Sequence, residues 1–318
     1  MLVRLTLMSS ILAAAALAQS DTPQPVRNDV RQKGEEVLVF RHQELVKGGH
    51  DSYYRISRDG VWPWYEKIGN RVVGQWMVIH PDGSPEPVDH DDSYRLARYA
   101  SYEHWKATRR GQIYGGNGPD YQANVAALRD RKHYEKGSDG AFFLQGVMAT
   151  ITPHYMPALD EKYEQGEAGD VHPVRNDVTW QAKEIIALNR WKVRKGSADE
   201  FIGAGTQGLW PYLEKVGARA VGIWKVIYPE GSAYKESPDY DEIFMMVRYA
   251  GYEHWKAAQP NEIVQMGGDG RDWEVYNSAL AKQKGLTRES SVTFLDGYFH
   301  QSPPWFRPGL GEKYRLAK

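Results

Sequence analysis

The chain has 318 residues, a formal net charge of −1 at pH 7 and no cysteine. Without cysteine there can be no disulfide, thiolate metal site or catalytic thiol. The balanced charge gives no electrostatic footprint for nucleic acid or anionic lipid, so we expect neither nucleic acid nor a membrane as a partner.

The first 18 residues have the pattern of an export signal. Arg4 precedes an apolar run from Leu5 to Leu17, and Ala16-Leu17-Ala18 fits a cleavage site. The run is shorter than the roughly 20 apolar residues that span a bilayer. We therefore predict that residues 1–18 are a signal peptide and that the mature protein is secreted or periplasmic.

The rest of the sequence contains one unit twice. Residues 62–84 and 210–232 are identical at 14 of 23 positions, with a shift of 148 residues. The shift grows to 150–152 in later matched blocks, as expected where loops absorb insertions. We therefore expect a first unit at residues 19–168 and a second at residues 169–318.

The first unit contains four segments with the composition of β-strands, at residues 36–46, 71–79, 94–100 and 141–152. Helical patterns lie between them, over residues 50–68, from residue 102 after the capping Ser101, and from Asp120 to about residue 132. We expect the first helix to break or restart at Trp62-Pro63, with Pro63 in a first-turn position, where proline is tolerated.

Two further local patterns concern the helix starts and the connection between units. In the second unit, Ser197 and Glu200 have the spacing of a capping box. The stretch at residues 164–173 contains Gly166 and Gly169 and predicts the link between the two halves.

A βαββαβ order of elements makes a four-stranded antiparallel sheet with helices on one face. The other face of the sheet stays open and must be buried against a partner. Two copies in one chain can bury these faces against each other. We therefore predict an α+β fold in which tandem ferredoxin-like repeats form an intrachain dimeric α/β barrel. This pseudo-dimer leaves further oligomerisation open.

Several motifs of the second half resemble the NIPSNAP family. They are Lys195-Gly-Ser-Ala-Asp-Glu-Phe201, the segment from Leu209 to Trp224, and Arg248-Tyr-Ala250 ahead of an aromatic helix. The resemblance extends over nearly all of the mature chain, once per half. It implies the dimeric α/β-barrel (ferredoxin-like) superfamily, which includes cofactor-independent monooxygenases, haem-degrading enzymes and chlorite dismutase-like proteins. It implies a fold and a pocket, and no particular substrate.

The strongest candidate site is the block Arg-Tyr-Ala-x-Tyr-Glu-His-Trp-Lys, at residues 98–106 and 248–256. An arginine at the end of a strand can hold a carboxylate or enolate with two hydrogen bonds. A histidine in the first turn of the next helix can exchange protons near neutral pH, and a tyrosine can donate a hydrogen bond. The candidate catalytic residues are Arg98, Tyr99, His104, Arg248, Tyr249 and His254.

The alternative for this block is structural. Tyr102 and Trp105 are three residues apart and would form one stripe facing the core. His104 lies about 200° from Tyr102 around the helix. In this interpretation, Glu103, His104 and Lys106 form a solvated face.

Other motifs favour ordinary structure over a site. Gly115–Asp120 and Gly267–Asp272 lack the spacing of phosphate-binding loops and predict a turn before a helix. The acidic stretches at residues 89–92 and 239–242 could hold Ca²⁺, but they lack EF-hand spacing, so we expect solvated loops. His80 and His90 are replaced by tyrosine in the second unit, so we predict no metal site common to both units.

The sequence does not identify a cofactor. One alternative is that the protein needs no cofactor. A haem would need a proximal histidine, for which His42, His154 and His300 are candidates. If the two units have diverged, polar strand residues without a counterpart, such as His42, Glu44 and His300, would mark the active one. The sequence does not select which.

Two functions follow from these observations. In the first, the protein binds a small apolar or aromatic ligand between sheet and helices. This function can include cofactor-independent oxidative or isomerising chemistry on that ligand. The alternative is a non-enzymatic carbohydrate- or protein-binding module. It would use surfaces supplied by the 11 Trp and 20 Tyr residues.

Overall fold

The structure, a computed structural model, describes residues 36–109, 119–148, 184–215, 218–249, 251–259 and 270–299. The predicted signal peptide, the predicted link, His154 and His300 lie outside these ranges.

The elements of the first unit are β1 (Val37–Val46), α1 (His50–Ile56), a π-helical turn (Ser57–Val61), α2 (Trp62–Lys67), β2 (Arg71–Ile79), β3 (His90–Tyr99), α3 (Tyr102–Thr108), α4 (Pro119–Arg131), a short 3₁₀ helix (Lys132–Tyr134), β4 (Glu135–Gly137) and β5 (Ala141–Met148). Those of the second unit are β6 (Ile185–Arg194), α5 (Ala198–Ala204), a π-helical turn (Gly205–Leu209), α6 (Trp210–Lys215), β7 (Arg219–Ile227), β8 (Tyr240–Tyr249), α7 (Tyr252–Ala257), α8 (Gly270–Leu286) and β9 (Thr287–Phe299).

The α-helix restarts at the Trp-Pro pair of each unit, as the sequence predicted. A π-helical turn joins the two α-helical parts, and the N–H of Trp62 donates to the carbonyl of Ser57. Pro63 then falls in the first turn of α2, where its missing N–H does no harm. The wider turn is thus the local solution to the proline.

The acidic stretches are not the solvated loops that the sequence predicted, because β3 and β8 begin within them. Asp91 is buried, and its Oδ2 accepts a hydrogen bond from the N–H of Gly48 at 2.8 Å. Asp241 accepts the matching bond from Gly196 at 2.8 Å. Both glycines have a positive φ, 74° and 78°. Each aspartate therefore fixes the tight turn between a strand and the following helix.

The capping box predicted in the second unit is absent. Ser197 occupies the cap position of α5 without a capping hydrogen bond from its side chain, and its Oγ lies 3.2 Å from Arg194 Nε. Glu200 instead forms an ion pair with Lys282 at 3.3 Å. The predicted cap at Ser101 is confirmed, since the His104 N–H donates to Ser101 Oγ at 3.0 Å.

Nine strands form one sheet in the described part of the chain, in the order β3-β2-β9-β6-β8-β7-β5-β1-β4. β1 also pairs with β3, so all strands except β4 close into a ring. The last strand of each unit crosses to the other unit, because β5 pairs with β7 and β9 pairs with β2. Every ladder is antiparallel. The predicted intrachain barrel of two ferredoxin-like units is confirmed.

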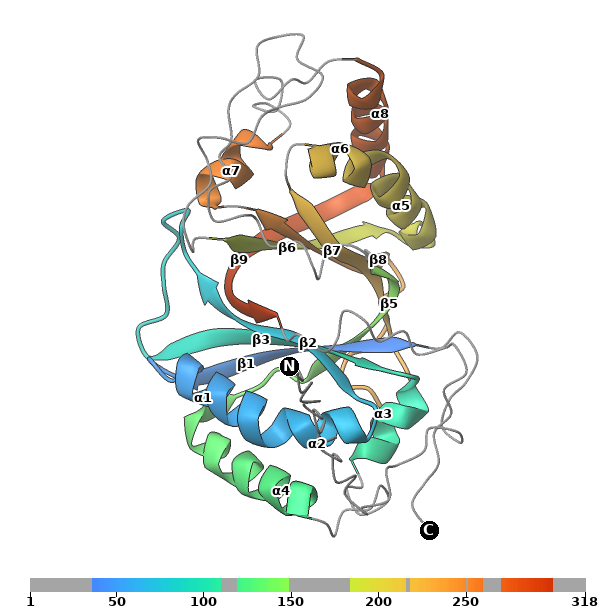
Figure 1. The fold of residues 1–318 in the computed structure, drawn as a ribbon. Helices are drawn as coiled ribbons and strands as arrows, with labels where there is room; N and C mark the ends of the chain where they lie inside the picture. Colours follow the sequence, from blue (N-terminus) through green and yellow to red (C-terminus); the bar gives the residue numbers. More distant parts are fainter. Residues whose placement is uncertain are drawn as a thin grey trace, which may run out of the picture.

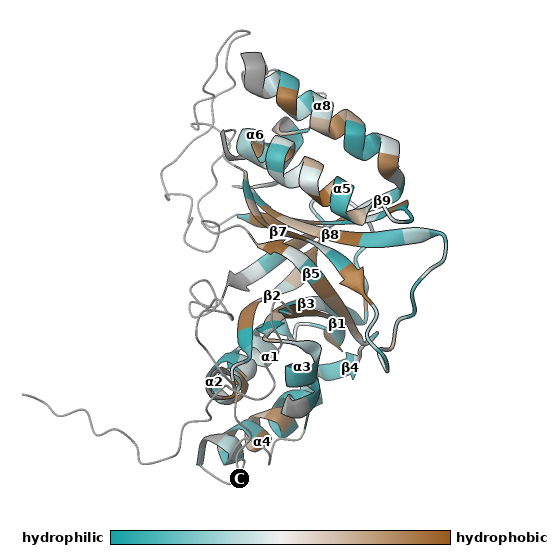
Figure 2. Ribbon diagram, turned by 90° about the vertical axis from the view of Figure 1, so that its right-hand side faces the viewer, coloured by the Kyte–Doolittle hydropathy of each residue, from teal (hydrophilic) through white to brown (hydrophobic). Residues whose placement is uncertain are grey.

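The barrel lies between two helical layers (Figure 1). Helices α1, α2 and α4 cover the outside of the first unit's strands, and α5, α6 and α8 cover the second unit's. The barrel interior is filled by apolar side chains from both units, including Phe40, Trp76, Phe142, Trp224 and Phe244. Hydrophobic segments accordingly concentrate along the strands in Figure 2. The barrel interior is therefore a packed core.

The repeated Phe-Leu-x-Gly motif has a specific role in closing the barrel. Gly146 of β5 pairs with Trp224 of β7, and Gly297 of β9 pairs with Trp76 of β2. A Cβ on Gly146 would lie 2.3 Å from the Ile223 carbonyl oxygen and 2.7 Å from Trp224 Cα. The two seams between the units therefore require glycine, because the facing backbones approach too closely for any side chain.

We predict that Gly146→Ala lowers the free energy of unfolding by about 1–3 kcal/mol or more, because the added methyl must push the two seam strands apart. Gly203→Ala is the matched control. It lies in α5 with nothing within 4 Å of the added Cβ, so it should be neutral or slightly stabilising. Urea denaturation of both variants measures the difference, and equal stabilities would contradict this role for the seam.

Candidate functional site

A row of polar side chains lies on the helix-facing side of the first unit's sheet. Gln75 on β2 pairs with Arg95 on β3, and Arg95 pairs with Arg41 on β1. Directly paired residues on neighbouring strands point to the same face of a sheet. This is the face that carries Val39 and Ala97, which pack against the helices. The row therefore faces the layer between sheet and helices.

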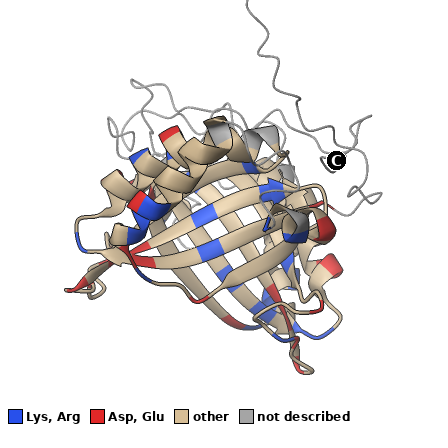
Figure 3. Ribbon diagram, turned by 90° about the horizontal axis from the view of Figure 1, so that it is seen from below, with Lys and Arg blue, Asp and Glu red and all other residues tan. Residues whose placement is uncertain are grey.

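Helical residues add to this row from the other side. Arg131 at the end of α4 donates to Ser57 Oγ at 3.3 Å, and its guanidinium carbon lies 5.2 Å from the centre of the Tyr53 ring. Arg109, which follows α3, lies 3.4 Å from the Tyr99 hydroxyl. We call Arg41, Arg95, Arg109 and Arg131 the arginine cluster. Figure 3 shows basic positions on neighbouring strands of the barrel.

Several polar atoms around the cluster are buried without a hydrogen-bond partner among the described residues. Arg95 is 5% exposed and Gln75 is 0% exposed. The NH1 group of Arg95 and both amide atoms of Gln75 have no partner. The same holds for Oδ1 of Asn70 and of Asn124. Buried polar groups are normally satisfied, so these atoms mark the layer as the candidate functional site.

Positive charge in the cluster exceeds the negative charge placed against it. The Oε1 of Glu135 lies 3.6 Å from Arg131 Nε and 3.1 Å from the Tyr53 hydroxyl. In the described ranges, neither Arg41 nor Arg95 forms an ion pair. Burial and the neighbouring Arg95 lower the pKa of Arg41 to about 10. Two guanidinium groups directly opposite each other destabilise a sheet unless an anion accompanies them.

The phenol of Tyr65 on α2 responds to the same field. Burial by itself would raise its pKa, but the guanidinium groups of Arg131, Arg95, Arg109 and Arg41 outweigh burial and lower the pKa. This direction is unusual for a tyrosine in a protein interior. The same charges therefore favour the phenolate form of Tyr65.

The second unit has none of these charges at the corresponding positions. Asn189, Met245, Gln259 and Gln283 replace the four arginines, while Ile223 replaces Gln75 and Leu213 replaces Tyr65. Ile223, Met245 and Leu213 belong to an apolar core under the second unit's helices. The same fold therefore closes this layer with ordinary packing, so the cluster is not a requirement of the fold.

The six residues predicted from the repeated block are divided between the two faces of the sheet. Arg98 pairs with Leu38, which lines the barrel interior, whereas the adjacent Tyr99 belongs to the core under the helices. Arg98 makes two hydrogen bonds with Glu36, at 3.0 and 2.8 Å. Arg248 makes the same bonds with Glu184, at 2.7 and 2.6 Å.

Tyrosine and histidine of the block are brought together. The rings of Tyr99 and His104 lie 5.6 Å apart, and those of Tyr249 and His254 lie 5.4 Å apart. His104 is 0% exposed. Its Nδ1 accepts from the N–H of Ala100 at 3.1 Å, and its Nε2 lies 2.7 Å from the carbonyl of Ile68. The neutral ring therefore joins the strand end to the preceding helix.

Tyr99 connects this block to the arginine cluster. Its hydroxyl accepts from Asn70 Nδ2 at 2.7 Å and from Arg109 at 3.4 Å. Burial raises the pKa of Tyr99, although nearby guanidinium groups, Arg109 foremost, oppose this. Tyr99 is thus the predicted site residue that lies in the polar layer.

His42 does not fit the role of a haem ligand. Its Nδ1 lies 2.7 Å from Asp139 and its Nε2 lies 2.8 Å from Asp92. Both ring nitrogens are therefore occupied by carboxylates. Within the described ranges, no group of three or more His, Asp or Glu side chains is arranged to hold a metal ion. No helix in these ranges combines the length and apolar character needed to cross a membrane.

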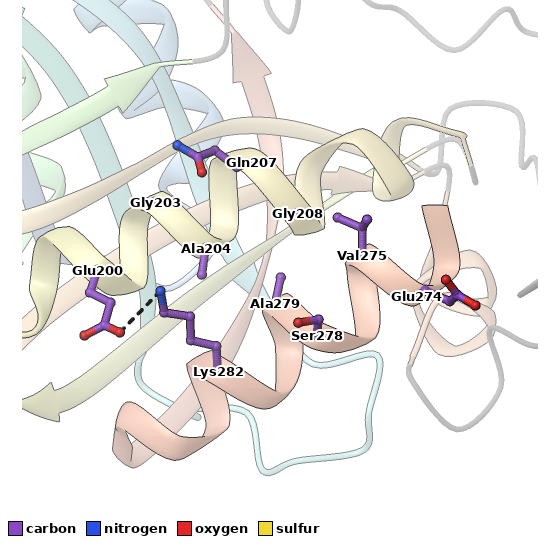
Figure 4. A pocket seen from close by; sticks show the side chains of 10 residues that line it. All are labelled: Glu200, Gly203, Ala204, Gln207, Gly208, Glu274, Val275, Ser278, Ala279 and Lys282. Carbon is purple, nitrogen blue, oxygen red and sulfur yellow. Dashed lines mark ion pairs between the residues drawn. The ribbon is translucent and has the colours of Figure 1, made fainter. Parts of the chain in front are cut away.

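A separate groove of about 510 Å³ lies between α5 and α8 of the second unit (Figure 4). Its walls include small residues such as Gly203, Gly208 and Ala279, with the Glu200–Lys282 ion pair at 3.3 Å. The charged groups of this ion pair satisfy each other. Nothing in the groove matches the unpartnered groups of the arginine cluster.

No family model matches the chain, and no curated protein matches it. Solved structures match at low identity. A putative monooxygenase from Lactobacillus acidophilus NCFM has a TM-score of 0.46 and 9% identity, over 83% of this chain and 94% of that one. A putative monooxygenase from Fusobacterium nucleatum has a TM-score of 0.46 and 10% identity, over 86% and 97%.

An anthrone oxidase-like protein has a TM-score of 0.45 and 12% identity, over 83% of this chain and 92% of its own. The strand order and the two crossing strands are those of a dimeric α/β barrel. The protein adopts that fold, with both ferredoxin-like units in one chain.

Proposed function

We propose that the first unit binds a small organic molecule between its sheet and its helices, and that the second unit serves mainly to complete the barrel. The observation that carries this proposal is the set of buried polar atoms without partners at Arg95 and Gln75. Leaving one such atom unsatisfied costs about 1–3 kcal/mol, and more when the group is charged. A bound molecule that accepts from Arg95 would remove this cost.

The chemistry that we favour needs no metal and no redox cofactor. Tyr65 can accept a proton from the ligand, because the guanidinium groups favour its phenolate form. The oxyanion left on the ligand would then lie among fixed positive charges, which stabilise it. Proton removal of this kind begins isomerising reactions, and also oxidative reactions in which an electron-rich anion reacts with dioxygen.

The residues of the repeated block take different parts in this proposal. Tyr99 borders the ligand layer through its contact with Arg109. His104 holds a strand end in place, as do the ion pairs of Arg98 and Arg248 in each unit. Tyr249 lies in the apolar core of the second unit. Direct catalytic roles for these residues stay a prediction from the sequence.

Two finer assignments belong to the same proposal. The motifs in the second half support membership of the NIPSNAP branch of the barrel superfamily. The apolar run ending at Ala18 supports export and cleavage. N-terminal sequencing of secreted material tests the second, and retention of Met1 would contradict it.

The binding-module alternative receives no comparable support. Wherever the structure describes its burial, a tryptophan or tyrosine side chain is buried or partly buried. The large hydrophobic side chains that are exposed there are valines, for example Val88 and Val275. An aromatic platform for stacking on sugars is therefore not formed by the described surface.

The first test converts the first unit's polar row into that of the second. A variant with Gln75→Ile, Arg95→Met and Arg41→Asn carries residues that occupy the same register in the second unit. We predict that fragments bound by the wild-type protein in ligand-observed NMR lose at least about tenfold in affinity, equivalent to 1.4 kcal/mol. Arg129→Met, at an exposed position on α4, is the control and should keep the hits.

If the triple variant binds the same fragments with unchanged affinity, the binding site lies elsewhere in the protein. Wild-type protein that binds no fragment would remove the proposal. Because the substituted residues already pack in the second unit, a folded variant is expected, and its thermal transition verifies this.

The acidic phenol gives a second test. In a near-ultraviolet titration, we expect one tyrosinate signal to appear below the usual pKa of 10.0 and to vanish in Tyr65→Phe. Between the two pKa values the folded state has lost a proton that the unfolded state keeps, so stability should rise with pH there. Tyr94→Phe is the control, because burial raises the pKa of Tyr94 to about 12. An unchanged titration in Tyr65→Phe would rule out the proton-acceptor role.

A further inference from the structure

We infer that the arginine cluster selects an organic carboxylate, with the carboxylate group held by Arg41 and Arg95 and the apolar part of the molecule directed toward Val39 and Ala97. This inference rests on the proposed function and names the class of ligand. Three observations carry it: the placement of the donors, the charge left over, and the change in character along the strands.

The donors form a line that suits a planar oxyanion. Adjacent strands lie about 4.8 Å apart, so the side chains of Gln75, Arg95 and Arg41 leave the sheet as neighbours. Guanidinium groups present several N–H donors in one plane and bind carboxylates through two parallel hydrogen bonds. The Arg95 NH1 group and the Gln75 amide are buried and unpartnered. They are therefore free to donate to a bound anion.

The charge balance favours an anion over a neutral molecule. Glu135 is the described carboxylate that contacts the cluster, and it is engaged with Arg131 and Tyr53. In the described ranges, Arg41 and Arg95 form no ion pair with a carboxylate. A neutral ligand could satisfy their hydrogen bonds but would leave their charges uncompensated in a layer of low polarity. A carboxylate compensates both.

The surroundings change from polar to apolar along the strands. On the same face of the sheet, the next pair on one side is Gln43 and Ser93, and the next pair on the other is Val39 and Ala97. Val39 and Ala97 belong to a core cluster that also contains Trp62. A molecule with a carboxylate at one end and an apolar or aromatic body at the other matches this order.

The test compares carboxylates with their amides. Thermal shift and calorimetric titrations at constant ionic strength would use benzoate against benzamide, phenylacetate against phenylacetamide, and inorganic phosphate. The proteins are the full chain in wild-type form, Arg95→Met, and the exposed control Arg129→Met. We expect the carboxylates to bind the wild-type and control proteins at least tenfold more tightly than the amides. We expect Arg95→Met to lose this preference.

A second readout does not depend on the choice of probe. Without any added anion, Arg95→Met should melt at the same temperature as the wild-type protein or higher, because it removes one of two opposed buried charges. The added carboxylates should then stabilise the wild-type and Arg129→Met proteins but not Arg95→Met.

The outcomes separate this inference from the proposed function. Amides that bind as well as carboxylates, and lose affinity in Arg95→Met, would keep the ligand site and overturn its anion selectivity. If inorganic phosphate stabilises the protein as strongly as the carboxylates do, the inference that the ligand is organic is wrong. Carboxylate binding that survives in Arg95→Met would overturn the assignment to this pair. Absence of all binding, with a lower melting temperature for Arg95→Met, would overturn both proposals.

Discussion

Pairing of each unit's last strand with the other unit is the constraint on which the rest of the structure depends. β5 and β9 leave their own helical layers and complete the partner unit's sheet. The facing backbones are so close at Gly146 and Gly297 that no side chain fits between them. This closure removes open sheet edges between the units and buries both inner faces at once. It also makes the two units mutually dependent, because neither sheet is complete without the other.

Closing the barrel gives every strand two different faces. The inner face is filled by aromatic and aliphatic side chains from both units. The outer face lies under helices, and its content is free to differ between units. In the second unit it is apolar and contains Met245 and Ile223. In the first unit Arg95 and Gln75 stand at the same register. The second unit thus fills this layer with apolar packing alone, whereas the first unit places polar and charged side chains in it.

That departure has a thermodynamic cost, because burial disfavours charged groups and polar groups without partners. Two arginines face each other across neighbouring strands, and buried atoms beside them lack partners. Sites that break local rules in this way are expected to be functional, since a ligand can supply what the chain omits. The lowered pKa of the Tyr65 phenol is a second consequence of the same field. Binding and proton transfer would both draw on the charge gathered there.

The fold was predictable because duplication showed the unit, and strand and helix patterns repeated in both copies. Local contacts were harder to predict. The position of His104 around its helix suggested a solvated face. Its ring is instead buried and forms hydrogen bonds with the backbone of Ala100 and Ile68. These partners come from outside its own helix, so helical periodicity does not show them.

The arginine cluster was also missed, although a signal was present. Arg41 and Arg95 have uncharged counterparts in the second unit, Asn189 and Met245. A charged residue in one half therefore stands against an uncharged one in the other at two paired strand positions. Their closeness depends on strand register and on α4 crossing the sheet, which sequence spacing alone does not specify.

The most direct test of the central claim is a high-resolution crystal structure of the protein purified from its host and kept free of carboxylate buffers. Our account predicts electron density for an organic anion within hydrogen-bond distance of Arg95, with its apolar part toward Val39. It would be contradicted if the Arg95 guanidinium and the Gln75 amide were satisfied only by protein groups or by water.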